Sequence, residues 1–367
     1  MFRLLATIAM ALAGPTIAVA QNPNKPTIST ILRSYDFDGV VVISPDDQDS
    51  ENLEWDNRNG IAKTADEAAV PWRWASVTKQ MIAILVMQQV ERGKIDLDKA
   101  ASVYLPNFSS PNADTVTVRQ LMQHQSGLPN PSDRDGNPSE RWAFFRDDFS
   151  GSRDPATGFC AGPVKGAPGD GWSYNNCDYM VLGALLEAVT DLSWQELFDR
   201  EIAKPLGLKS TGVFASPTYP GDLGTRVGRV WGRREWHWDL STLGASASMF
   251  GSAADLIAID RALMDGRLLR EKALEQMWYG DPALGYMAIG QWAYPAQLEG
   301  CDEAVEIVER HGDMGATQVR NFILPDDGIA VVMFSQSLPF DYGEILDQSG
   351  FAYDILSATV CAQEQVQ

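Results

Sequence analysis

The stretch RWASVTKQMIAILVMQQVERG, residues 73–93, decides the fold of this chain. It predicts a helix over residues 76–92 that ends at Gly93. Its segment MIAILVM is apolar all round, so we expect the helix to be buried on every side. Ser76 and Lys79 stand one helical turn apart and would share a face. Two interpretations follow: Ser76 caps the helix, or Lys79 is the base that activates a nucleophilic Ser76.

The composition is that of an acidic chain able to bury a large core. Its 367 residues are 45% hydrophobic and 21% charged, with a formal net charge of -20 and a pI near 4.5. A nucleic-acid binder needs a basic footprint, so this class is excluded.

The first twenty residues have the pattern of an export signal. Arg3 supplies the positive start, LLATIAMALAG is a short apolar run, and AVA provides small residues before Gln21. A membrane anchor is the alternative, which Gly14 and Pro15 disfavour because they interrupt the apolar run. We expect a signal peptide over residues 1–20 and a mature protein that is periplasmic or secreted.

Four cysteines in an exported chain suggest disulfide bonds. Cys160 and Cys177 bracket a Gly/Pro-rich loop, and Cys301 and Cys361 would tie the C-terminus to an upstream segment. Three pairings are formally possible, and free buried thiols are the alternative.

Strand-like sequence stands at both ends of the chain, with helical sequence between. The expected strands are 37–44, 52–63, 284–294, 303–310, 317–325 and 328–336. The further expected helices are 117–124, 178–190, 191–207, 252–266 and 342–359. The simplest architecture is an α+β fold in which both termini build one antiparallel sheet, flanked by helices and carrying an inserted helical region. We expect a single catalytic unit over 21–367, with a sheet region of about 36–95 plus 245–367 and a helical region of about 96–244.

Two further segments carry candidate site residues. WSYNN, residues 172–176, sets Tyr174 and Asn176 on a Gly-rich loop before an apolar helix. A neutral lysine or a tyrosinate can take a serine proton if its pKa is lowered far enough. VERHGDMGATQVR carries His311 at the exposed end of an expected strand.

Six motifs in this order resemble the serine beta-lactamase-related family, which holds class C beta-lactamases, D-alanyl-D-alanine carboxypeptidases, D-aminopeptidases and esterases. They are ASVTKQ, VERGKIDLD, YLPNF, TVRQLMQHQSGLP, WSYNN and IAKPLGLKSTGVF. The resemblance extends from about Phe37 to Ser357 and implies the beta-lactamase/transpeptidase-like fold.

The resemblance also implies a role for each matching position. Ser76 would be the nucleophile, Lys79 its proton acceptor, and Tyr174 the group that passes the proton to the leaving group. Asn176 would bind Lys79 and the substrate, and the backbone N–H groups of Ser76 and Met314 would form the oxyanion hole.

The strand motif HGDMG departs from the Lys-Thr-Gly of relatives. His311 would stand at the lysine position, which makes efficient penicillin hydrolysis less expected. Asp313 replaces the glycine, and we hypothesise that it favours substrates with an ammonium group.

Three other site hypotheses have weaker support. GFCAG around Cys160 fits a nucleophile elbow but lacks the flanking strand and helix. The three histidines form no zinc motif, and His124 is interpreted as structural. His237 and Trp231, Trp236 and Trp238 either line the pocket or pack against the helical region.

The sequence therefore predicts an exported serine hydrolase that forms an acyl-enzyme and cleaves an ester or a D-amino-acid amide. The alternatives are a beta-lactamase, a penicillin-binding carboxypeptidase, or a relative that kept the fold as a non-catalytic binder. The expected partner is a small-molecule or peptide substrate with a carbonyl group, and neither a metal nor an organic cofactor is required.

Overall fold

One six-stranded antiparallel sheet organises the molecule, in the order β2-β1-β11-β10-β9-β8. The computed structural model describes residues 26–45, 53–56, 70–133, 143–214, 217–219, 221–222, 228–235 and 239–360. The six strands are β1 (Gly39–Ser44), β2 (Leu53–Asp56), β8 (Trp292–Ala296), β9 (Val305–Met314), β10 (Thr317–Leu324) and β11 (Ile329–Ser335). The pairing of β1 with β11 joins the two ends of the chain, with Val40 opposite Phe334. This confirms the predicted fold class.

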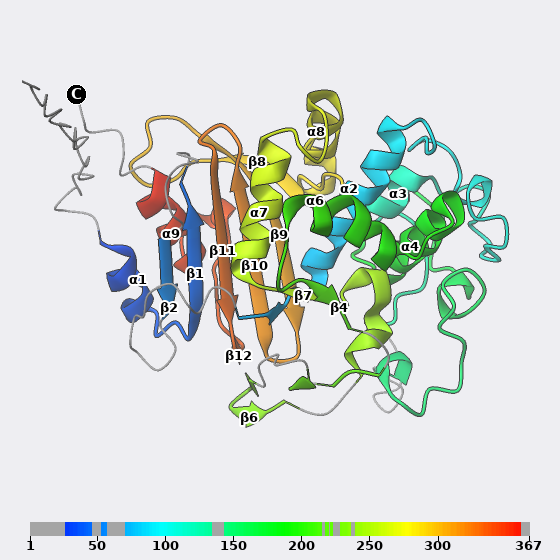
Figure 1. The fold of residues 1–367 in the computed structure, drawn as a ribbon, viewed down its shortest axis with the longest axis horizontal. Helices are drawn as coiled ribbons and strands as arrows, with labels where there is room; N and C mark the ends of the chain where they lie inside the picture. Colours follow the sequence, from blue (N-terminus) through cyan, green and yellow to red (C-terminus); the bar gives the residue numbers. More distant parts are fainter. Residues whose placement is uncertain are drawn as a thin grey trace, which may run out of the picture.

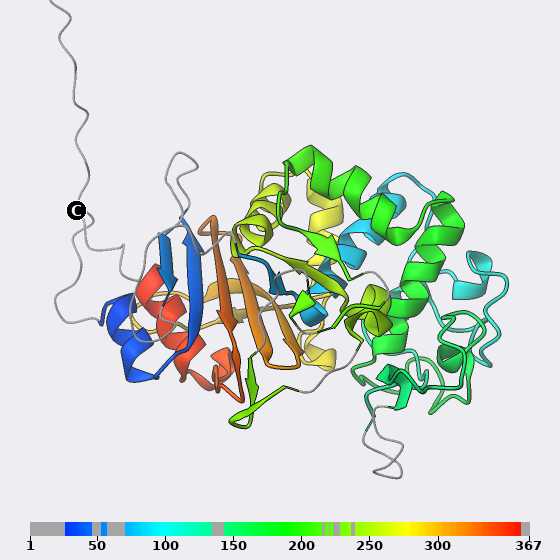
Figure 2. The ribbon, with the colours of Figure 1, turned by 60° about the horizontal axis from the view of Figure 1, so that its bottom comes forward.

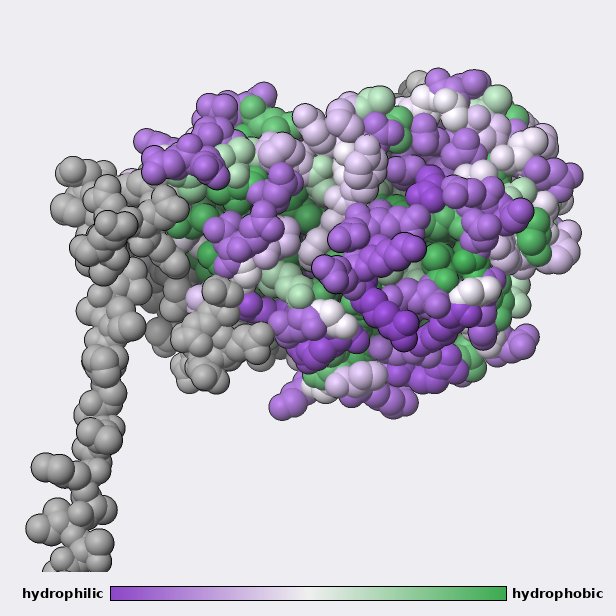
Figure 3. Space-filling model, turned by 90° about the horizontal axis from the view of Figure 1, so that it is seen from above, coloured by the Kyte–Doolittle hydropathy of each residue, from purple (hydrophilic) through white to green (hydrophobic). Residues whose placement is uncertain are grey.

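The strands β1 and β11 are buried on both faces, which is why they are apolar without a polar face. Val41 and Ile43 point toward α1 (Ile28–Ser34) and α9 (Phe351–Val360). Val40 and Val42 point to the opposite face, into the larger core shared with the other helices. Figures 1 and 2 show α1 and α9 together on one side of the sheet and the helical region on the other. Hydrophilic side chains are widespread on the outer surface that Figure 3 shows, with apolar ones between them.

The helix α2 (Thr78–Glu91) is the centre of the larger core, as its sequence predicts. Every residue from Thr78 to Gln89 is buried. The helix ends where Gly93 takes a φ of +68°, a value that glycine adopts without strain. α2 thereby holds the start of the helical region against the sheet.

The helical region and the segments around it contain the remaining elements. The helices are α3 (Val118–Met122), α4 (Asn176–Thr190), α5 (Trp194–Phe198), α6 (Lys204–Leu206), α7 (Ala253–Met264) and α8 (Glu271–Met277). Two small sheets have the orders β3 (Trp72–Arg73), β7 (Met249–Gly251), β4 (Gly212–Val213) and β12 (Ser337–Leu338), β5 (Arg229–Val230), β6 (Arg233–Arg234). Within the described ranges, no helix has both the length and the apolar character needed to cross a bilayer.

Several predicted elements have different bounds in the structure. Of the strand expected over 52–63, Leu53–Asp56 is seen and the other residues lie outside the described ranges. The helix expected over 191–207 begins only at Trp194. The strand expected over 284–294 begins only at Trp292, because Gly285, Tyr286 and Gly290 have positive φ values that break an extended chain. The helix expected over 342–359 begins only at Phe351, after Gly350 with a φ of +101°. The strand expected to end at residue 310 continues to Met314.

Candidate active site

Ser76 lies in a short 3₁₀ turn, Ala75–Val77, that leads directly into α2. Ala75 before it has a φ of +47°, which is strained for a residue with a side chain and is typical of functional sites. The residue that caps α2 is Val77, and no side chain bonds to the helix end there. The capping interpretation of Ser76 is therefore wrong.

The Ser76 hydroxyl instead contacts both predicted proton-transfer groups. Its Oγ lies 2.5 Å from the Tyr174 hydroxyl and 3.2 Å from Nζ of Lys79. Nζ of Lys79 also lies 2.6 Å from the Tyr174 hydroxyl. These three groups, from the start of α2 and from the loop before α4, form a closed triangle in which a proton can move between any two.

Two neutral carbonyl groups accept hydrogen bonds from Lys79. Its Nζ donates to Oδ1 of Asn176 at 2.8 Å and to the carbonyl oxygen of Ser246 at 2.9 Å. Burial lowers the pKa of Lys79 well below its usual value, and the positive charge of Arg310 adds to the effect, while Asp178 opposes it. A neutral amine with two hydrogens donated to these carbonyls keeps its lone pair for a hydroxyl.

The Tyr174 side chain is fixed by the loop that carries it. Its carbonyl oxygen accepts from Nδ2 of Asn130 at 2.9 Å, and its ring lies 4.7 Å from that of His124. Asn175 caps α4 by accepting from the N–H of Cys177. Burial raises the pKa of the Tyr174 phenol, whereas Arg310 and Ser76 lower it. The two shifts favour a neutral phenol on Tyr174 beside a neutral amine on Lys79.

Arg310 is the site residue that sequence reasoning missed. Its Nε donates to the carbonyl oxygen of Ser76 at 3.0 Å, and its Nη2 lies 3.4 Å from the Tyr174 hydroxyl. The side chain is fully buried and its guanidinium stacks on Trp292 at 5.1 Å. Two residues further along β9, Gly312 allows close approach, since a Cβ there would be 3.0 Å from the Ser76 nitrogen.

His311 and Asp313 point to the other face of the sheet, contrary to the expectation. In β9, Val305 and Ile307 belong to the core under α9, and side chains alternate along a strand. His311 accordingly pairs with Glu309, Nε2 to Oε2 2.9 Å, and Asp313 pairs with Arg320 at 3.0 Å. The side chain of β9 that faces Ser76 and Tyr174 is therefore Arg310, whereas His311 lies on the opposite face.

Backbone N–H groups alternate in direction along β9, and this changes the expected oxyanion donor from Met314 to Asp313. Ala293, opposite Val308, donates its N–H away from β9 to Tyr286. The even-numbered residues of β9 therefore bond toward β10, and the odd-numbered ones toward β8. Beyond Trp292 the N–H of Asp313 faces the free edge beside Ser76, while the N–H of Met314 faces Thr317.

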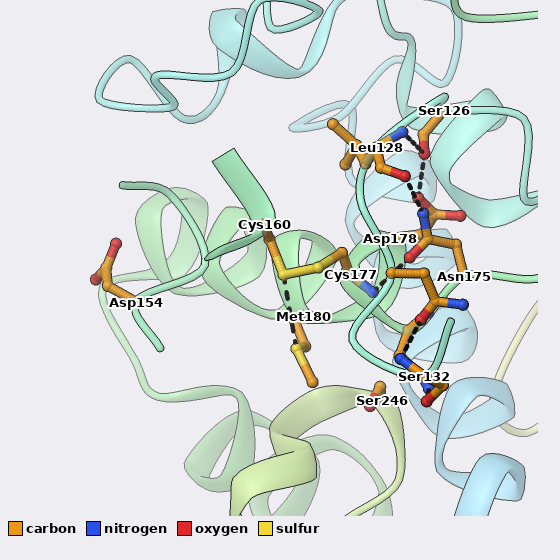
Figure 4. Close-up of a disulfide and its surroundings, with 12 residues drawn as sticks. Ser126, Leu128, Ser132, Asp154, Cys160, Asn175, Cys177, Asp178, Met180 and Ser246 are labelled. Carbon is orange, nitrogen blue, oxygen red and sulfur yellow. Dashed lines mark hydrogen bonds between the residues drawn. A yellow bond between two sulfur atoms is a disulfide. The ribbon is translucent and has the colours of Figure 1, made fainter. Parts of the chain in front are cut away.

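The Cys160–Cys177 disulfide, predicted as one of the possible pairings, is present in the structure. It links the Gly/Pro-rich loop to the first turn of α4, next to Asp178, as Figure 4 shows. Cys160 is thus no free nucleophile, and the elbow interpretation of GFCAG is wrong. Cys361 lies outside the described residues, so its pairing with Cys301 stays a prediction.

His124 supports the loop before α4 rather than taking part in proton transfer. It accepts the N–H of Asn175, 3.3 Å from its Nδ1, and the same nitrogen lies 3.0 Å from Oδ2 of the buried Asp178. Burial lowers the pKa of His124 and raises that of Asp178, which favours the neutral form of each side chain. Within the described ranges, no group of three or more His, Cys, Asp or Glu side chains is arranged to hold a metal ion.

Comparison with known protein families gives one match, to the model described as Beta-lactamase, over residues 25–350. The chain belongs to the beta-lactamase family. Among curated members, it is 33% identical to esterase EstB of Burkholderia gladioli over 156 residues, which are 40% of this chain and 39% of EstB. It is 29% identical to penicillin-binding protein 4 of Amycolatopsis lactamdurans over 223 residues, 56% of this chain and 53% of that protein. This chain thus spans about half or less of these two relatives.

Solved structures of beta-lactamase-family fold cover almost the whole chain. The D-stereospecific amidohydrolase of a Streptomyces species superposes with a TM-score of 0.69 at 20% identity, covering 91% of this chain and 98% of that one. This likeness supports the fold. Together with the family match, it identifies the chain as a serine hydrolase of the beta-lactamase family.

The Trp-rich segment contributes little that can be described. Trp231 is 70% exposed, and Trp236, His237 and Trp238 lie outside the described residues. The aromatic side chains next to the site are instead Trp172 and Trp292, whose ring centroids are 6.3 Å apart.

Proposed function

We propose that this protein is an exported serine hydrolase that forms an acyl-enzyme on Ser76 and cleaves an ester or a D-amino-acid amide. The observation that carries the proposal is the closed triangle of Ser76, Lys79 and Tyr174, with a buried Lys79 whose pKa is lowered. A nucleophile within hydrogen-bonding reach of an oriented base is the requirement for covalent catalysis.

Acylation begins when the lone pair of Lys79, directly or through the Tyr174 hydroxyl, takes the Ser76 proton. The Ser76 oxygen then attacks the substrate carbonyl, and the carbonyl π electrons move onto its oxygen. Arg310 stabilises any negative charge that Tyr174 carries during the transfer, since Nη2 lies 3.4 Å from the phenol oxygen. A fully buried guanidinium so close to the phenol oxygen supports this role.

The oxyanion would be held by the N–H groups of Ser76 and Asp313. The first lies at the start of α2, and the second faces the free edge of β9. Removing one such donor costs about 2.7–4 kcal/mol in other serine hydrolases. Because both donors are backbone N–H groups, a side-chain substitution affects them only if it changes the course of the backbone.

Collapse of the tetrahedral intermediate breaks the bond to the leaving group, which receives its proton from Tyr174 or Lys79. Water then attacks the acyl-serine, and the same base takes its proton. The acid product leaves, and Ser76 regains its proton. No step needs an electron donor or acceptor.

The proposed substrate class rests on what the relatives are named for. EstB is an esterase by name and the Streptomyces structure is a D-stereospecific amidohydrolase. A second candidate is a lactam or another substrate with a carboxylate. Nη1 of Arg310 is buried and donates no hydrogen bond to any described residue, and a carboxylate could accept from it.

The proposal is tested by the hydrolysis of p-nitrophenyl esters and D-phenylalanine amide with matched variants. Ser76→Ala and Lys79→Ala should each abolish turnover while the protein stays folded. The exposed Ser349→Ala and Lys272→Ala variants serve as controls and should keep activity. Near wild-type turnover by Ser76→Ala would refute the mechanism, whatever the substrate.

Export is proposed from the sequence of residues 1–20, which lie outside the described residues. N-terminal sequencing of the protein recovered from the periplasm or the medium should find Gln21 first. An intact Met1 on protein that stays in the cytoplasm would contradict it.

A further inference from the structure

A pocket of about 300 Å³ lies on the face of the sheet opposite Ser76. Its walls are the rings of Trp292, Tyr294 and His311, with Glu309 in its floor and Glu344 and Leu346 at its rim. Its volume is at the lower end of the range for small-molecule sites. Glu344 and Leu346 are exposed, so the pocket is open to solvent.

The pocket has a negative and aromatic lining. Glu309 is only 8% exposed, and Tyr294 donates to it. Burial opposes the ionisation of Glu309, but His311 and Tyr294 hold its pKa below the usual value. No lysine or arginine is among the residues that line it. The lining is therefore a carboxylate and aromatic rings, the groups that recognise organic ammonium ions.

One carboxylate oxygen in the floor has His311 as an ion-pair partner but receives no well-aligned hydrogen bond from it. Oε2 of Glu309 lies 2.9 Å from Nε2 of His311, yet it accepts no well-aligned hydrogen bond from any described residue. A buried oxygen of this kind is costly unless a donor reaches it. Glu309, His311 and Glu344 do not converge as metal ligands within the described ranges. An organic ammonium ion that carries N–H groups could donate to this oxygen, and its charge would suit the aromatic lining.

Trp292 connects this pocket to the reaction site. Its ring is 5.1 Å from the Arg310 guanidinium on the catalytic face and 5.7 Å from the His311 ring on the pocket face. Glu309 precedes Gly312 by three residues on the same strand, a separation of about 10 Å. Beyond Trp292 no described strand pairs with this edge of β9, which lies between the pocket and Ser76.

We propose that this pocket binds an organic ammonium group, and that the preferred substrates carry such a group about 10 Å from the scissile carbonyl. The substrate part rests on the proposed hydrolase function. The sequence suggested that Asp313 recognises the ammonium group. We assign this role to Glu309 instead, because Asp313 is paired with Arg320.

Binding to the pocket is measured first, by calorimetric titration of the full mature chain with benzylammonium, which carries N–H donors, and with neutral benzyl alcohol. We expect the cation to bind on the order of tenfold more tightly. Glu309→Gln should remove this preference, and Glu344→Gln should reduce it if the first variant does not fold. Glu306→Gln, an exposed glutamate on the same strand, is the control and should leave the preference intact. Equal binding of the two probes, or no binding of the cation, overturns the proposal.

The substrate part is measured with two p-nitrophenyl esters of equal chain length, one ending in an ammonium group and one in a methyl group. The ammonium ester should have a KM lower on the order of tenfold, and Glu309→Gln should bring the ratio of the two KM values toward one. Equal KM values with measurable turnover overturn the substrate inference and leave the hydrolase function standing. Absence of turnover of both esters refutes the esterase function, while the titration still decides the pocket.

Discussion

Arg310 should control both the rate and the pH dependence of acylation. Its Nη2 lies 3.4 Å from the Tyr174 oxygen. A full negative charge on that oxygen would be stabilised by about 5 kcal/mol at an effective dielectric constant of about 20. Only part of that charge develops while the proton is shared. We therefore expect Arg310→Gln to cost about 3 kcal/mol, a loss on the order of 10²-fold in kcat/KM.

The sign of the pH effect follows from the same charge. Burial is the main cause of the low pKa of Lys79, and Arg310 is the second. Removing Arg310 raises that pKa, and activity requires neutral Lys79, so the rising limb of kcat/KM must move to higher pH. Arg310→Lys keeps the positive charge but loses the planar guanidinium with its paired N–H donors. It should therefore recover part of kcat/KM and reverse part of the shift in the rising limb of the pH profile.

The assay is hydrolysis of a p-nitrophenyl ester from pH 5 to pH 10 or so, with the exposed Arg270→Gln as the control. Unfolding by urea, followed in parallel, separates loss of chemistry from loss of structure. A variant that keeps wild-type kcat/KM, or whose rising limb moves to lower pH, would refute the reasoning about Arg310.

Three further predictions concern the site and the core. Tyr174→Phe removes the hydroxyl between Ser76 and Lys79, so kcat/KM should fall by about 10²–10⁴-fold in the same ester assay; an unchanged rate would exclude Tyr174 from proton transfer. Replacing both Cys160 and Cys177 by serine opens a loop with a sequence separation of 17 and should lower the free energy of unfolding by about 3 kcal/mol in urea titration, and equal midpoints would contradict this. Burial raises the pKa of Asp260 to about 7, so the native state binds a proton that the unfolded state releases, and native stability falls as the pH rises from about 4 to about 7. Asp260→Asn should lack this fall, and parallel pH profiles of the two unfolding free energies would disprove it.

Sequence reasoning reached the buried central helix and the proximity of Ser76 and Lys79 because both depend on local patterns. The continuous apolar run after Lys79 leaves no polar face, and α2 is indeed buried throughout. The spacing of Ser76 and Lys79 by one turn brings their side chains to 3.2 Å. The contact of Tyr174 and Asn176 with Lys79 was reached only through the family resemblance, since their separation in sequence carries no local signal.

Arg310 and the pocket on the other face could not be predicted in the same way. β9 buries Glu309 and Arg310 on opposite faces, so the alternation of apolar residues that normally assigns faces is lost where the site begins. The motif HGDMG pointed to His311, which is one residue away from Arg310, the residue whose side chain faces Ser76. A one-residue slip in a strand exchanges the two faces, which is why His311 and Asp313 lie away from Ser76.

The most direct test of the account is the mass of the protein trapped during turnover. The mature chain is mixed with a p-nitrophenyl ester, quenched in acid within the first turnovers, and analysed by intact mass and peptide mapping. We predict one added acyl group on the peptide that contains Ser76, absent in Ser76→Ala and strongly reduced in Lys79→Ala. Turnover of the ester with the acyl group on another residue, or unchanged labelling in Lys79→Ala, would contradict the central claim.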